Sequence, residues 1–152
     1  MLRLFTLCLA LCFAWPAIAQ QADAPIQQIL QSHAKIVAKA SRKTISPAID
    51  ALTQSGLPEA QVVFEKWQAK EMWQSKETGL FVYAEEIDKK TLRIFDFAGG
   101  VDLGEVPDKE WKQLKPNSGV RGLIGAALVT FQLKAPDAEV RAGALDAIGR
   151  DP

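Results

Sequence analysis

The sequence predicts an α+β fold that is mostly α, with HEAT-like helix pairs flanking a β-hairpin insertion. Three observations predict it. Apolar residues recur at helical spacing on both sides of the middle of the chain. Residues 73–107 instead show two-residue alternation and clustered glycines. A five-residue apolar pattern, Ala48–Leu52, returns as Ala144–Ile148, which suggests a repeated helix pair.

Residues 1–19 are predicted to be a secretory signal peptide. Arg3 precedes an apolar run from Leu4 to Trp15, and residues 17–19, Ala-Ile-Ala, have the small-x-small pattern of a cleavage site. The run has about 12 residues, which is shorter than the roughly 20 that a membrane-spanning helix needs. The expected product is periplasmic. A lipoprotein anchored at Cys12 is the alternative, but Leu11 stands where a small residue is needed.

Residues 20–152 are predicted to be a single helical-repeat domain with a β-hairpin at about residues 79–97. Both cysteines, Cys8 and Cys12, lie in the leader, so the remainder must be held together by an apolar core or a partner rather than by disulfides. The chain has 18 basic and 18 acidic residues, and losing Arg3 leaves a net charge of about −1. This balance predicts no attraction to nucleic acid or to an anionic membrane.

The first helices are expected before residue 70. Residues 25–40 carry apolar side chains at three- and four-residue spacing and begin with a proline, which a first helical turn accepts. Ser46-Pro47 has the form of a helix start, and Ser55-Gly56 ends that element. A further helix is expected from Leu57-Pro58-Glu59, so that two short helices form an αα-hairpin.

The middle stretch predicts two short strands. Residues 81–84 and 92–95 alternate, and the charged turn 86–90 joins them. Gly99-Gly100 and Gly104 then mark turns, because glycine adopts backbone conformations that other residues avoid.

The helical pattern returns after residue 117. Asn117 or Ser118 can cap a helix that continues to about Leu133, and polar residues and glycines within it predict a buried amphipathic helix rather than a membrane span. Residues 135–137, Ala-Pro-Asp, lead into a last helix that is followed closely by Pro152. The C-terminal helix pair is expected to be an unpaired or truncated repeat unit.

Catalytic chemistry is not predicted. His33 is the sole histidine and lies on the apolar side of the first helix, which favours a structural role. Glu85 and Glu86 are adjacent on a strand and point to opposite faces, so they do not form an acid/base pair. The glycine-rich run 99–104 lacks a phosphate-binding pattern. We therefore expect no enzyme, no metal site and no cofactor.

The aromatic residues leave two interpretations open. They form either a core between hairpin and helices or an exposed patch for a protein partner. The candidate partner-contact residues, including two polar positions near the start of the penultimate helix, are Trp73, Phe81, Tyr83, Asn117 and Arg121.

The motifs together resemble a known family, the exported N-terminal domain of the urea-type ABC transporter permease, which is related to branched-chain amino acid permeases. The matching motifs are Ala48–Leu52 with Ser55-Gly56, Trp73–Glu85 with Lys76 and Gly79, Leu103–Pro107, Asn117 with Arg121, and Pro136–Arg141. The resemblance implies a non-enzymatic helical-repeat domain that assists urea or amide uptake through contacts with the permease and the substrate-binding protein.

Two departures from the family bear on that function. Ser118, Gly119 and Gly122 replace a second asparagine and basic residues, and the permease's transmembrane helices are missing. The chain is therefore expected to be either the separated front part of a permease or a free-standing exported relative. The alternative function is a periplasmic scaffold or binding module unrelated to transport. A small hydrolase would need a nucleophile with a base, which the sequence does not offer.

Overall fold

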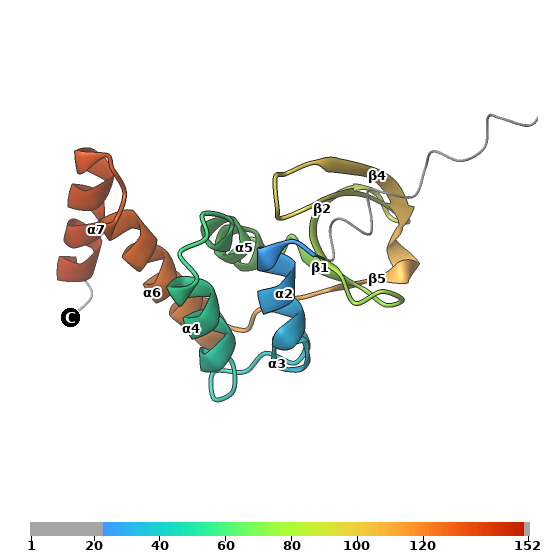
Figure 1. The fold of residues 1–152 in the computed structure, drawn as a ribbon, viewed down its shortest axis with the longest axis horizontal. Coiled ribbons are helices and arrows are strands. Elements are labelled where there is room, and N and C mark those ends of the chain that lie inside the picture. Colours follow the sequence, from blue (N-terminus) through green and yellow to red (C-terminus); the bar gives the residue numbers. More distant parts are fainter. Residues whose placement is uncertain (1–22, 151–152) are drawn as a thin grey trace, which may run out of the picture.

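The structure is a computed structural model that describes residues 23–150, so the predicted signal peptide with both cysteines lies outside the described residues. Figure 1 shows helices α2 to α5 and most of α6 gathered beside a curled sheet, with α7 at the far end of the molecule. In chain order the elements are α2 (Pro25–Ser32), α3 (Ala34–Ala38), α4 (Ser46–Gln54), α5 (Glu59–Gln68), β1 (Met72–Ser75), β2 (Phe81–Asp88), β3 (Thr91–Phe95), β4 (Asp102–Pro107), the 3₁₀ turn η1 (Asp108–Glu110), β5 (Trp111–Gln113), α6 (Ser118–Leu133) and α7 (Ala138–Arg150).

The α+β class is confirmed. The strands form one antiparallel sheet in the order β4-β3-β2-β1-β5. β2 and β3 are neighbours joined by Lys89-Lys90, within the range predicted for the hairpin. The hairpin does not stand alone, because β1, β4 and β5 extend the sheet on both sides. Whether the helix pairs are HEAT-like repeats stays a prediction.

The first predicted helix is interrupted. The sequence pattern predicted one helix over residues 25–40, but α2 ends at Ser32 and α3 begins at Ala34. Between them His33 has φ −109° and ψ 12°, and the side chains of both Ser32 and His33 bond to the Ile29 carbonyl oxygen, at 2.8 Å and 2.9 Å. Such local side-chain bonds compete with helical backbone bonds and favour a break.

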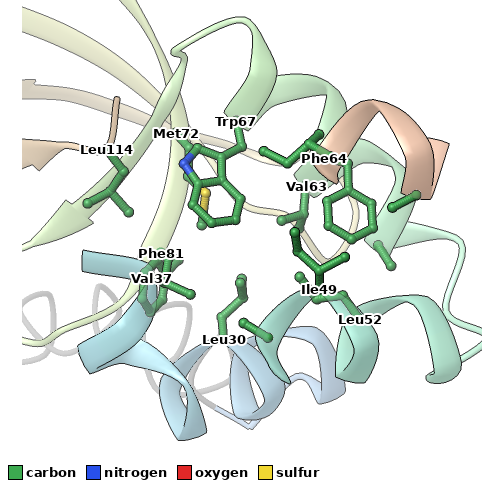
Figure 2. Packing of buried hydrophobic residues seen from close by; sticks show 14 of the residues in the cluster. Leu30, Val37, Ile49, Leu52, Val63, Phe64, Trp67, Met72, Phe81 and Leu114 are labelled. Carbon is green, nitrogen blue, oxygen red and sulfur yellow. The ribbon is translucent and has the colours of Figure 1, made fainter. Parts of the chain in front are cut away.

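The main core fills the space between the helices and one face of the sheet. Figure 2 shows Trp67 and Phe64 of α5 packed among side chains from α2, α4 and the strands. Trp67, Phe64 and Phe81 are each 0% exposed. Burial of one such side chain stabilises a fold by about 1.5–3 kcal/mol, so this cluster supplies the cohesion that disulfides would otherwise give.

The other face of the sheet has a core of its own. Because side chains alternate along a strand, Phe81 of β2 joins the main core while its neighbours Val82 and Ala84 point the other way. There they meet Trp73, Leu92 and Ile94, and residues of β4 and β5 pack against this second cluster. The curl of the sheet closes over its own apolar face (Figure 1).

Of residues 23–150, no helix combines the length and the apolar character that crossing a membrane requires.

Candidate functional site

Two of the five candidate contact residues lie in the interior. Phe81 is 0% exposed in the main core, and Trp73 is 8% exposed in the second cluster. Because side chains alternate along paired strands, Trp73 and Phe81 lie on opposite faces of the sheet, and other residues of the fold cover each face. Phe81 is therefore a core residue, whereas Trp73 also lines the cleft described below, so a role of Trp73 in partner contact stays a prediction.

Tyr83 is half-buried and organises a small surface cluster. Its ring stacks on Phe95 with the ring centroids 5.1 Å apart and the planes at 12°, and Phe97 lies 5.5 Å away. The Lys66 Nζ atom stands 4.8 Å from the centroid of the Tyr83 ring. An ammonium at this distance is attracted by the ring's negative face. We call Lys66, Glu71, Tyr83 and Phe95 the Lys66 cluster.

The end of α5 brings Glu71 to Lys66. Lys70 has φ 67°, and the Glu71 N–H bonds back to the Lys66 carbonyl oxygen while the Lys70 N–H bonds to that of Trp67. This is the Schellman termination with a lysine at the left-handed position that glycine usually takes. The turn places Glu71 Oε2 2.8 Å from Lys66 Nζ.

This pairing changes the proton affinity of the lysine. The pKa of Lys66 is raised above its ordinary 10.5, chiefly by the hydrogen bond to Glu71; burial, the next largest effect, opposes this, and electrostatic interactions with Glu71, Tyr83 and Glu85 raise the pKa further. Lys66 is therefore a fixed cation at neutral pH rather than a nucleophile, because a nucleophilic lysine needs a lowered pKa.

A cleft of about 420 Å³ opens beside the cluster, lined by the end of α5, strands β1 and β2, and Gln113. Trp73 and Ala84 give it an apolar part, while Glu71, Glu85 and Glu86 border it. Glu85 lies opposite Arg93 and Glu86 opposite Leu92 in the ladder, so the two carboxylates occupy successive positions of the strand. Nothing in this lining pairs a nucleophile with a base.

Asn117 and Arg121 belong to the start of α6. The Asn117 side chain accepts a hydrogen bond from the Val120 N–H at 3.0 Å, which confirms it as the helix cap, and its Nδ2 donates to the Ala40 carbonyl oxygen at 3.4 Å. Arg121 is exposed on the first turn of the helix. These two residues therefore lie on a different element from Tyr83.

The α7 helix carries a surface that the sequence did not single out. Val140, Leu145 and Ile148 are 43%, 61% and 49% exposed, and Ala144 is the buried residue among them. α7 packs on α6, so only one edge of its apolar stripe is covered. We call Val140, Leu145 and Ile148 the α7 apolar face. The helical spacing was visible in the sequence, but the spacing does not tell whether a neighbour covers it.

The remaining candidate residues make local hydrogen bonds that hold the backbone around them. His33 is half-buried and bonds within its own turn. Asp96 lies just before the glycine-rich run 99–104. Its side chain accepts hydrogen bonds from the N–H groups of Gly99 and Val101 at 2.9 Å and 3.0 Å, so the start of this run forms a turn. Arg141 donates to the carbonyl oxygens of Ala135 and Pro136. Within residues 23–150, no group of three or more potential ligands is placed to hold a metal ion.

No protein-family model, no curated protein and no solved structure matches the chain.

Proposed function

We propose that the chain is a non-enzymatic exported domain that assists ABC-type uptake of urea or short amides by binding other proteins. The proposal rests on the resemblance of its motifs to the front domain of a urea-type permease and on the leader at residues 1–19. The partners would be the permease and its substrate-binding protein.

The α7 apolar face is the observation that carries a protein-contact role. Exposed apolar side chains grouped on one element are typical of sites that bind other proteins. At about 100° per residue, Val140, Ile148 and Leu145 span an arc of about 140° around α7, and the buried Ala144 lies within this arc. We further propose that α4–α5 and α6–α7 are HEAT-like helix pairs; in support, α6 contacts α4, α5 and α7, as stacking of neighbouring repeats requires.

The test is capture of the permease and the substrate-binding protein from the same cell by the full chain. The variant with Leu145→Ser and Ile148→Ser should lose capture, because both substitutions remove exposed apolar contact area. The matched control, Ile87→Ser with Val101→Ser, changes two equally exposed apolar residues in the sheet and should capture normally. Failure of the unaltered chain to retain either protein would contradict the proposal.

The second candidate function is a periplasmic scaffold or binding module unrelated to transport. The same exposed face supports it equally well, because an apolar helix face does not specify its partner. Selective retention of an identified exported protein outside any transport system, lost in the α7 variant and kept in the control, would favour it.

A further inference from the structure

Two stretches of the sequence carry cations without any acidic residue. Between Asp23 and Asp50 there is no Asp or Glu, and the same holds between Glu110 and Asp137. Each stretch contains four Lys or Arg residues. In a chain with equal numbers of basic and acidic residues, such stretches create local excesses of positive charge that the total hides.

The fold brings the two stretches together. Lys112 Nζ donates to the Ala38 carbonyl oxygen at 2.9 Å, so the end of β5 touches the end of α3. The Asn117 side chain reaches the Ala40 carbonyl oxygen. At Gly119 an added Cβ would come within 2.9 Å of the Arg42 Cβ, so Arg42 lies directly against the start of α6.

We call the resulting surface the basic face, and its six exposed residues are Lys35, Lys39, Arg42, Lys43, Lys112 and Lys115. Arg121 lies outside it, because two residues along a helix turn the side chain by about 200° away from Gly119, which faces Arg42. Lys134 lies outside it too, at the opposite end of α6.

Within the described residues, neither the salt bridge of Lys66 with Glu71 nor that of Arg93 with Asp102 involves a residue of the basic face. The acidic residue nearest to the face in the chain is Glu110, two residues before Lys112. Other acidic residues lie on other elements, including Glu85 and Glu86 beside the cleft of about 420 Å³. The protein is therefore electrically polarised although its net charge is close to zero.

We propose that the basic face binds the anionic phospholipid surface of a membrane. Five of its six cations are lysines, which act as mobile point charges and lack the planar fork that arginine offers to a single phosphate or carboxylate. No residue of the basic face lines the cleft of about 420 Å³ beside the Lys66 cluster or the hollow between α2 and the end of α4 that Pro25, Ile29 and Leu57 border, and all six cations are exposed. Several lysines spread over such a surface suit a layer of charged headgroups.

Other polyanions fit this face less well. Protein interfaces depend on buried aromatic or arginine anchors, and single-stranded nucleic acids stack on aromatic side chains. The large exposed apolar residues of the described chain are Ile87, Val101, Val140, Leu145 and Ile148, and none belongs to the face. Binding to lipid here requires no transport partner, so it stands or falls separately from the proposed function.

The test is co-sedimentation of the full chain with vesicles. Vesicles of phosphatidylcholine alone measure any contribution of the leader, and vesicles that also contain phosphatidylglycerol measure the electrostatic part. Lys35→Gln, Lys39→Gln and Lys43→Gln together remove three charges whose side chains make no hydrogen bond within residues 23–150. Each lysine near an anionic surface contributes about fivefold in affinity, so this variant should bind the mixed vesicles about 100-fold more weakly.

The matched control removes three exposed lysines elsewhere, Lys89→Gln, Lys90→Gln and Lys134→Gln, and should bind within about threefold of the unaltered chain. Raising the salt concentration should abolish the preference for phosphatidylglycerol. Equal losses in the two variants, or a preference that survives high salt, would overturn the proposal. If the chain bound a single-stranded oligonucleotide more tightly than mixed vesicles at the same salt concentration, the ligand of the basic face would be nucleic acid and the lipid proposal would be wrong.

Discussion

The side-chain amide of Gln27 on α2 pairs with both backbone polar groups of Phe81 on β2. Its Nε2 donates to the Phe81 carbonyl oxygen, and its Oε1 accepts from the Phe81 N–H at 3.1 Å. Phe81 lies before Tyr83, where the pairing of β2 with β3 begins, so the glutamine occupies the place of a missing strand partner. These bonds fasten the helical layer to the sheet.

Replacing Gln27 by leucine should destabilise the fold strongly. Gln27 is 1% exposed, so the Phe81 N–H and carbonyl would lose their partners in a place that water does not reach. Each unsatisfied buried group costs about 1–3 kcal/mol, and we expect a loss of about 2–4 kcal/mol in the free energy of unfolding by urea. Gln31→Leu, the same change at an exposed position of α2, should alter it by less than about 0.5 kcal/mol. A comparably small effect at Gln27 would contradict the role of this pairing.

Removing the cap of α6 should cost about 1 kcal/mol. Asn117→Ala removes the bond to the Val120 N–H and the bond to the Ala40 carbonyl oxygen. Asn117→Asp keeps an acceptor for Val120 but has no donor for Ala40, so most of the stability should return. The midpoint temperatures of thermal unfolding of the unaltered protein and the two variants give their order of stability. If the aspartate variant were no more stable than the alanine variant, the cap would not be the main contribution.

Gly100 should not tolerate a side chain, whereas its neighbour should. Gly100 has φ 70°, and an added Cβ would stand 3.1 Å from the Tyr83 hydroxyl oxygen. Gly100→Ala should therefore destabilise by about 1–2 kcal/mol, from backbone strain and from displacement of the Tyr83 ring. Gly99→Ala is the control, because its nearest neighbour would be a Val101 methyl at 3.8 Å. Equal stability of the two variants in urea would show that neither constraint matters.

The Lys66–Glu71 pair should stabilise the fold only below the alkaline range. The pKa of Lys66 is raised in the folded protein above 10.5, its ordinary value, so the folded state holds the proton more tightly than the unfolded chain. The stabilisation is complete below pH 10.5 and disappears as the pH rises through the folded pKa. Because the pair is 31% and 40% exposed, about 0.5 kcal/mol is expected.

Glu71→Gln tests this dependence in urea unfolding experiments. The unaltered protein should exceed the variant by about 0.5 kcal/mol near pH 8, and the difference should vanish once Lys66 is neutral. The titration of other groups affects both proteins alike, so the difference between them isolates the pair. A difference that stays constant through the alkaline range would mean that Lys66 and Glu71 are not coupled.

Local sequence signals predicted several elements because they depend on neighbouring residues. Ser46-Pro47 and Ser55-Gly56 mark the two ends of α4, but the expected cap by Ser46 is wrong, because Ile45 holds the N-cap position and no side chain caps the helix. Asn117, one of the two expected candidates, caps α6. The two strands of the hairpin were also predicted locally, from the alternation of side chains along each strand. The break at His33 was missed, because the helix period of residues 25–40 continues across it, and only the side-chain bonds to Ile29 reveal the interruption.

The candidate site was less predictable, because its residues come from distant segments. From the sequence alone, Phe81 and Trp73 could belong either to a core or to a contact patch. In the structure, Phe81 lies in the main core and Trp73 in the second apolar cluster, because both faces of the sheet are covered. The Lys66 cluster depends on the left-handed turn at Lys70, and no local rule places a lysine there. The basic face was hidden by a balanced total charge, since a sum carries no information on position.

The sequence by itself determined the α+β class, several helix starts and stops, and the alternation of the central strands, because these follow from interactions between residues close in the chain. The tertiary structure decided that Trp111–Gln113 forms a strand. Lys112 and Gln113 have little strand preference of their own, and the segment is held extended by pairing with β1, which lies more than 30 residues earlier in the chain. It also decided which apolar side chains stay exposed, because burial depends on the neighbours that the complete fold supplies.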